Sequence, residues 1–197
     1  MALEDIFHEA LDEFLAREFA LVRKDAHEQS LCGRLAIYMD HAKDRHGLED
    51  YYVDVEYNRR GEGRKQILHP VTGKHINVVC DILLHSRGDL EDDNLIAIEM
   101  KKDDAEDEKK QGDRDRLKAL TLPIPQRGNP DYVCGYQIGY YLEVHIGNAT
   151  LLIEEYRGGN LSQSGTKDFA RPEGSRSDSG LFARLESPPR RSTRRKR

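Results

Sequence analysis

The chain has 197 residues, 31 Lys and Arg against 36 Asp and Glu, and a formal net charge of −5, which fits one domain with a proper core plus extensions. Three separated cysteines without zinc-ligand spacing exclude a disulfide framework and a zinc finger. The lack of a signal peptide, of an apolar run near transmembrane length, of a nucleophile elbow and of a phosphate-binding glycine loop predicts a cytoplasmic protein outside the usual hydrolase and nucleotide-binding classes.

The first half of the chain contains two helical patterns and one strand pattern. Apolar residues at helical spacing predict an N-terminal helix over residues 3–22, in an extension (1–24) that packs on the domain or on a partner chain. A second amphipathic helix is expected from Ser30 to about Lys43, with Glu28 in line with its apolar stripe. Residues 51–57 alternate with the period of a strand.

A β-hairpin is predicted next. The apolar runs 77–84 and 95–101 are joined by the polar turn 86–94. Because side chains alternate along a strand, Glu99 and Lys101 should point to one face and Met100 to the other.

The second half continues with a polar helix over residues 104–121, expected to loosen near Gly112, and with strands over 132–144 and 150–155. After the N-terminal extension, the predicted order of elements is therefore α, β, β, β, α, β, β.

The hairpin carries charges in apolar surroundings. Asp81 and Glu99 lie on adjacent predicted strands, and Lys101 follows one step further along the same face. Burying such charges is costly unless a divalent metal compensates them. Two carboxylates and the Met100 carbonyl are hard oxygen ligands of the kind that Mg²⁺ prefers, and Lys101 is placed to orient or deprotonate a water or to hold a phosphate. The alternative is a half-exposed hairpin in which Lys101 forms a cross-strand salt bridge with Glu99 or Asp81.

Asp81 with Glu99-Met100-Lys101 resembles the signature of the PD-(D/E)XK nuclease superfamily, although Cys80 stands where the signature has Pro. The resemblance covers about residues 25–155. It implies an α/β, restriction-endonuclease-like fold, with an αβββαβ core and a central mixed sheet flanked by helices, in a domain over 25–156.

The resemblance also implies a function. It is that of a small stand-alone bacterial or phage endonuclease which hydrolyses phosphodiester bonds in DNA, in restriction, repair or phage defence, with Mg²⁺ or, as a substitute, Mn²⁺. Asp81, Glu99 and Lys101 would be catalytic, and the metal would be held by Asp81, Glu99, the Met100 carbonyl and Glu28. For Glu28 a second interpretation remains open, because Asp25 and Glu28 have the spacing of a helix capping box.

Basic residues outside the hairpin suggest contacts with nucleic acid. Those in the loop after the first strand are expected to bind phosphates: Arg59, Arg60, Arg64 and Lys65. Residues 157–197 are predicted to form a disordered tail, and their 11 Lys and Arg against 4 Asp and Glu give +7, which leaves −12 for the remainder. This arm would bind DNA or fold back on the acidic core. Because the core is acidic, DNA affinity is expected to come from the tail, a homodimer groove or a partner protein.

Two alternatives to a nuclease are left by the sequence. A catalytically inactive nucleic-acid-binding or assembly protein could use the same fold, although the intact Asp81, Glu99 and Lys101 set argues against it. An unrelated α/β protein with a surface hairpin is the other, and strand register and distances decide that question.

Overall fold

The computed structural model describes residues 3–57, 59–60, 63–64, 66–68, 75–77, 79–123 and 135–170. The helices are α1 (Leu3–Arg17), α2 (Phe19–Arg23), α3 (Glu28–Arg45) and α4 (Asp107–Leu120). The strands are β1 (Tyr52–Tyr57), β2 (Arg59–Arg60), β3 (Gly63–Arg64), β4 (Gln66–Leu68), β5 (His75–Asn77), β6 (Cys80–His85), β7 (Asn94–Lys102), β8 (Ile138–His145), β9 (Thr150–Arg157) and β10 (Asn160–Asp168).

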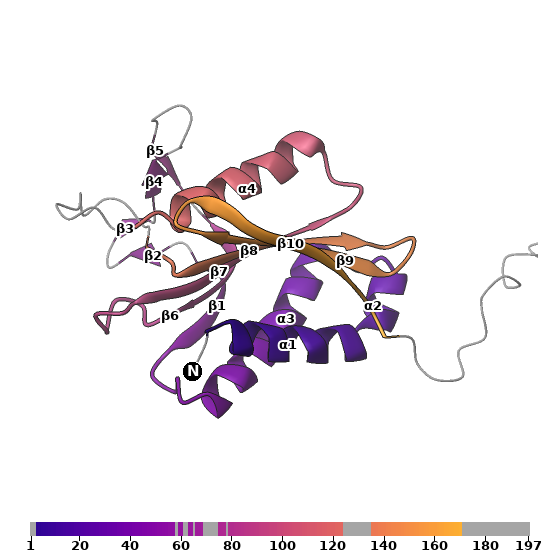
Figure 1. The fold of residues 1–197 in the computed structure, drawn as a ribbon, viewed down its shortest axis with the longest axis horizontal. Coiled ribbons are helices and arrows are strands. Elements are labelled where there is room, and N and C mark those ends of the chain that lie inside the picture. The colour runs from indigo at the N-terminus through magenta and orange to yellow at the C-terminus, as the bar shows by residue number, and fades with distance from the viewer. Residues whose placement is uncertain are drawn as a thin grey trace, which may run out of the picture.

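One mixed sheet organises this part of the chain (Figure 1). Within the described residues it has six strands in the order β1-β6-β7-β8-β9-β10. The β7–β8 pair is parallel, and the other neighbouring pairs are antiparallel. A parallel pair needs a crossover, and α4 supplies it between β7 and β8. The expected mixed α/β class is therefore confirmed.

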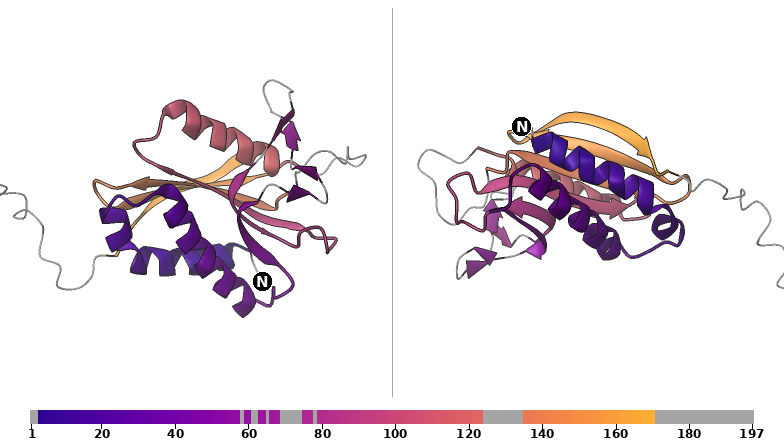
Figure 2. Two further views of the ribbon diagram at one scale, coloured as in Figure 1. Left: turned by 180° about the vertical axis from the view of Figure 1, so that it is seen from behind. Right: turned by 90° about the horizontal axis from the view of Figure 1, so that it is seen from below.

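Helices cover both faces of the sheet: α1 and α3 lie on one side and α4 on the other (Figures 1 and 2). The alternation predicted for β7 places its residues in the two layers. Ile98 and Met100 belong to the core under α1 and α3, whereas Ala97 packs with Leu117 and Tyr141 beneath α4. The α4 face of β7 is therefore the face that carries Glu99 and Lys101.

The N-terminal helix is part of this same core. Residues 3–22 were expected to form one helix, but α1 ends at Arg17 and the short α2 begins at Phe19. The buried stripe of α1 joins the core of α3 and the sheet, and the Phe7 ring stacks on that of Tyr140 with centroids 3.6 Å apart. The N-terminal helix was expected to pack on the domain or on a partner chain, and the structure shows it packed on the domain.

The expected break near Gly112 is wrong, because α4 is continuous from Asp107 to Leu120. A glycine inside a helix costs only about 1 kcal/mol relative to alanine. The buried anchors of α4 on the sheet, Leu117 and Leu120, hold the helix through that position.

The prediction that disorder begins at residue 157 is also wrong. Residues 160–168 form β10, which pairs antiparallel with β9 along its length. Gly158 and Gly159 adopt positive φ angles of 55° and 79° and make the connecting turn, and Phe169 is buried in the main core. Backbone pairing does not require apolar side chains, which is why the polar composition of this strand was misleading. Residues 171–197 lie outside the described part of the chain.

Within the described ranges, the helices are all too short or too polar to cross a bilayer.

Candidate active site

The candidate site forms where β6 and β7 stop pairing. Their register runs from Leu84↔Ile96 to Ile82↔Ile98. One step further on, Oδ2 of Asp81 accepts a hydrogen bond from the Met100 N–H at 2.8 Å. The Asp81 carboxylate thus takes the place of a ladder acceptor, and it faces Glu99 across the separating strands.

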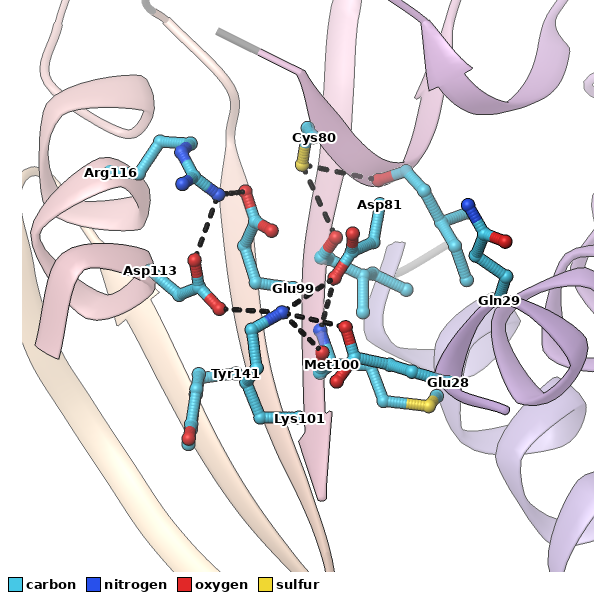
Figure 3. Close-up of polar contacts among 12 residues, drawn as sticks. Glu28, Gln29, Cys80, Asp81, Glu99, Met100, Lys101, Asp113, Arg116 and Tyr141 are labelled. Atoms are coloured by element: carbon cyan, nitrogen blue, oxygen red, sulfur yellow. Dashed lines mark hydrogen bonds and ion pairs between the residues drawn. The ribbon is translucent and has the colours of Figure 1, made fainter. Parts of the chain in front are cut away.

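Lys101 extends into a group of oxygen atoms from four elements, β6, β7, α3 and α4 (Figure 3). Its Nζ lies 2.8 Å from Glu28 Oε1 and 3.0 Å from the Met100 carbonyl oxygen. The same atom lies 3.0 Å from Asp113 Oδ2 and 3.8 Å from Asp81 Oδ2. The structure therefore brings the predicted residues Glu28, Asp81, Met100 and Lys101 together around one ammonium group.

Glu28 is the first residue of α3, and the capping-box interpretation of this residue is wrong. The N-cap of α3 is His27, and no side chain caps the helix by a hydrogen bond. The Glu28 carboxylate instead reaches Lys101 on β7. Next to it, Gln29 Nε2 donates to Glu56 Oε1 at 2.6 Å, and this bond ties the start of α3 to β1.

Two site residues on α4 were missed from the sequence: Asp113 and Arg116. Arg116 Nη1 lies 2.7 Å from Glu99 Oε1 and 3.0 Å from Asp113 Oδ1. The mixed charges of α4 resembled those of a solvated helix. However, Asp113 and Arg116 share the helix face of Leu117 and Leu120, because residues three and four apart are neighbours on a helix. The spacing of Asp113 and Arg116 from the two leucines was therefore the feature of the sequence that indicated that they face the sheet.

Carboxyl groups outnumber cations in this group, which we call the Lys101 cluster. It comprises four carboxyl groups and two cations: Glu28, Asp81, Glu99, Asp113, Lys101 and Arg116. The Glu99 side chain is 0% exposed, and neither of its oxygens accepts a hydrogen bond of good geometry from the described residues. Oε1 has the Arg116 ion pair, and the other near neighbours of this carboxyl group are the Asp81 carboxyl group and the Cys80 thiol rather than a second cation. A buried oxygen in this condition is costly unless a ligand satisfies it.

Burial raises the pKa values of three carboxyl groups in the cluster: Glu28, Asp81 and Glu99. Burial raises the pKa of Glu99 well above its usual range, and Arg116 only partly opposes this. Burial also raises the pKa of Asp81 and of Glu28, against the opposing effect of Lys101. Strongly perturbed carboxyl groups of this kind concentrate at functional sites.

The pKa of Lys101 is shifted in the direction that keeps its side chain charged. Burial alone would lower the pKa of Lys101, but Asp81, Glu28 and Asp113 outweigh that effect and raise it above the ordinary lysine value. Lys101 is therefore an ammonium donor at neutral pH rather than a base. Of the roles considered from the sequence, orienting a water or holding a phosphate fits this charge, and deprotonating a water does not.

The oxygen atoms of the Lys101 cluster include donors that suit a divalent cation. No group of three or more His, Cys, Asp or Glu side chains forms a ready metal cage in the described ranges. However, the buried Glu99 carboxyl group, the neighbouring Asp81 carboxylate and the Met100 carbonyl are hard oxygen donors, and the carboxylate excess matches a doubly charged ion. The donor set thus fits Mg²⁺ or Mn²⁺, once the Lys101 ammonium gives up some of these oxygens.

The predicted nucleic-acid contacts are only partly within the described chain. Arg59 and Arg60 form β2 and Arg64 lies in β3, with Arg59 opposite Arg64 in a short antiparallel ladder. The side chains of these arginines and all of Lys65 lie outside the described residues.

The three comparisons, with protein-family models, with curated proteins and with solved structures, found no match to this chain.

Proposed function

We propose that this protein is a metal-dependent nuclease that hydrolyses phosphodiester bonds in DNA with Mg²⁺ or Mn²⁺. The observation that carries the proposal is the excess of carboxylate in the Lys101 cluster, at the point where β6 and β7 separate. A surface salt bridge does not require a fully buried glutamate whose oxygens accept no hydrogen bond of good geometry from the described residues. The hairpin salt bridge considered from the sequence therefore accounts for less of this geometry.

The proposed metal ligands are Asp81, Glu99, the Met100 carbonyl and Glu28. A bound divalent ion supplies a water of lowered pKa and neutralises charge that develops on the phosphate. Asp81 is held for this role by the Met100 N–H, and Glu99 is held by Arg116.

Lys101 acts in the proposal through its N–H groups. Its ammonium lies among carboxylates of β6, α3 and α4, and it remains charged at neutral pH. It can donate to a phosphate oxygen or orient the attacking water.

The order of elements supports a restriction-endonuclease-like arrangement, which we include in the proposal. When the short strands β2 to β5 outside the six-stranded sheet are left aside, α3, β1, β6, β7, α4 and β8 follow the sequence α, β, β, β, α, β, and the site lies on the two central strands of that series. The proposed catalytic motif on β7 meets the helix that carries Glu28 through the contact between Lys101 and Glu28 (Figure 3).

The test is a cleavage assay on supercoiled, linear and single-stranded DNA with Mg²⁺, Mn²⁺ or EDTA. Asp81→Asn retains an acceptor for the Met100 N–H but removes the charge, and Lys101→Met removes the ammonium. Asp92→Asn and Lys109→Met are matched controls at exposed positions. We expect metal-dependent cleavage by the wild type and both controls and a loss in both site variants.

Cleavage that survives Asp81→Asn and Lys101→Met would defeat the site assignment. Nucleic-acid binding by the wild type without cleavage under any metal condition would instead support the inactive binding protein.

Part of the DNA affinity is assigned to residues 171–197, which contain 9 Lys and Arg against 3 Asp and Glu. The truncation should follow Ala170, because β10 and Phe169 belong to the fold. Each Lys or Arg that no longer contacts a DNA phosphate makes the negative slope of log K against log salt shallower by about 0.9. We expect the truncated protein to bind DNA more weakly with a shallower slope, and an unchanged slope would remove the arm from the proposal.

A further inference from the structure

A chain of alternating charges links both ends of the strand motif through α4. Glu99 contacts Arg116, Arg116 contacts Asp113, and Asp113 contacts Lys101. Glu99 and Lys101 lie two residues apart on β7, and Asp113 and Arg116 lie three apart on α4. The four side chains therefore close a ring between the strand and the helix (Figure 3).

Asp113 is oriented from both sides within this ring. Its Oδ1 lies 3.0 Å from Arg116 Nη1 and its Oδ2 lies 3.0 Å from Lys101 Nζ. The residue is 4% exposed, and Oδ2 accepts no hydrogen bond of good geometry from the described residues besides this ion pair. Because water is largely excluded, the attraction of Asp113 for the ammonium is stronger than at a surface.

The ammonium is closer to α4 than to Asp81. Lys101 Nζ lies 3.0 Å from Asp113 but 3.8 Å from Asp81 Oδ2. An ammonium drawn fully onto Asp81 would compete with a cation for the same carboxylate. The ammonium also lies 2.8 Å from Glu28 Oε1 and 3.0 Å from the Met100 carbonyl oxygen, which are proposed ligands that it would have to release to a cation. Among its oxygen partners in the described residues, the Asp113 carboxylate on α4 is separate from the proposed metal ligands.

We propose that Asp113 is a positioning residue for Lys101, which anchors the ammonium to α4 and keeps it from competing with a divalent cation at Asp81. Arg116 fixes the orientation of Asp113 and of Glu99 at the same time. This inference rests on the proposed function, and it adds a helix-borne residue that the strand motif does not contain.

The experiment measures Mn²⁺ affinity without nucleic acid, from the electron paramagnetic resonance signal of free Mn²⁺. Asp113→Asn is made in the wild type and in a Lys101→Met background. Asp115→Asn is the matched control, since it makes the same change on the same helix, where Asp115 pairs with Lys118 outside the cluster. Circular dichroism melting of each variant verifies that it is folded.

We expect Asp113→Asn to weaken Mn²⁺ binding by about 10-fold to 100-fold, the range for residues that orient metal ligands or their neighbours. In the Lys101→Met background the same substitution should change affinity by less than about 3-fold, because no ammonium remains to compete. Asp115→Asn should leave the affinity unchanged.

An equal loss in both backgrounds would overturn the inference by making Asp113 a direct ligand. No loss in either background, with Mn²⁺ bound by the wild type, would reduce Asp113 to a structural residue and leave the proposed function standing. A folded wild type that binds no Mn²⁺ would overturn the proposed function, and this inference with it.

Discussion

Two polar groups lie between α4 and the sheet, and they differ in charge balance. The first is the Lys101 cluster, with four carboxyl groups and two cations. The second, which we call the Lys110 network, has two of each: Lys110, Arg114, Glu143 and Glu154. Both are largely withdrawn from solvent and both are held by the same helix.

Every charge in the Lys110 network has a partner. Lys110 Nζ lies 3.0 Å from Glu143 Oε1, and Arg114 forms two bonds to Glu154 at 2.8 and 3.2 Å. Tyr141 donates to Glu143 Oε2, and Tyr156 donates to Glu154 Oε2, which also accepts from Arg114. The pKa of Glu143 is lowered, because hydrogen bonds from Lys110 and Tyr141 outweigh the raising effect of burial.

From this contrast we infer that the Lys110 network stabilises the fold and that the Lys101 cluster keeps its excess of carboxyl groups for the proposed ligand. The pKa values of Glu28, Asp81 and Glu99 in the Lys101 cluster are raised, whereas that of Glu143 in the Lys110 network is lowered. A satisfied network stabilises its helix, whereas an unsatisfied one costs stability until a ligand arrives.

The largest expected effect is on activity, from Glu99→Gln. Loss of partners that only orient metal ligands already costs about 10-fold to 100-fold, so loss of a proposed ligand should reduce cleavage by at least about 100-fold. Stability should be unchanged or higher, since Arg116 keeps Asp113 as a partner and one buried charge is gone. Cleavage rates and urea unfolding measure the two effects. Retained cleavage with lower stability would reverse the assignment of the two groups.

The second-largest expected effect is a loss of stability in the Glu143→Gln variant. The amide leaves Lys110 without its carboxylate, and hydrogen bonds to charged groups are worth about 2 kcal/mol. We expect urea unfolding to show a loss of that size, with cleavage within a few-fold of the wild type. A much larger loss of cleavage at full stability would place Glu143 in the catalytic group.

The smallest effect is a pH dependence of that stability difference. A carboxyl group with a lowered folded pKa contributes stability that is fully present above its unfolded pKa, about 4.3 for Glu, and is lost as pH falls through the folded pKa. The difference between wild type and Glu143→Gln should therefore be constant from pH 7 to about 5 and should shrink below about 4. Urea unfolding at three pH values measures it, and a difference that grows with acid would contradict the lowered pKa.

The predictable parts of this molecule were those with strong periodicity. The apolar alternation of β6 and β7 predicted which face carries Glu99 and Lys101, and the structure confirms that Met100 points to the opposite core. Glu28 was predicted as a site residue from the resemblance, and its helical spacing lined it up with an apolar stripe. Such patterns depend only on local geometry.

The parts that were missed depend on tertiary contacts. Asp113 and Arg116 look like surface charges in the sequence, and only the packing of α4 onto β7 buries them. The polar strand β10 was taken for disorder because its pairing with β9 uses backbone groups, which composition does not reveal.

Diffraction from crystals soaked in Mn²⁺, with the anomalous signal of that ion, tests the central claim most directly. The carboxylate excess of the Lys101 cluster predicts a peak within about 2.5 Å of oxygens of both Asp81 and Glu99, with Lys101 Nζ still on Asp113. A crystal in which Mn²⁺ binds only at other places, and no ion contacts the Glu99 carboxyl group, would contradict the proposal that the Lys101 cluster binds a divalent cation.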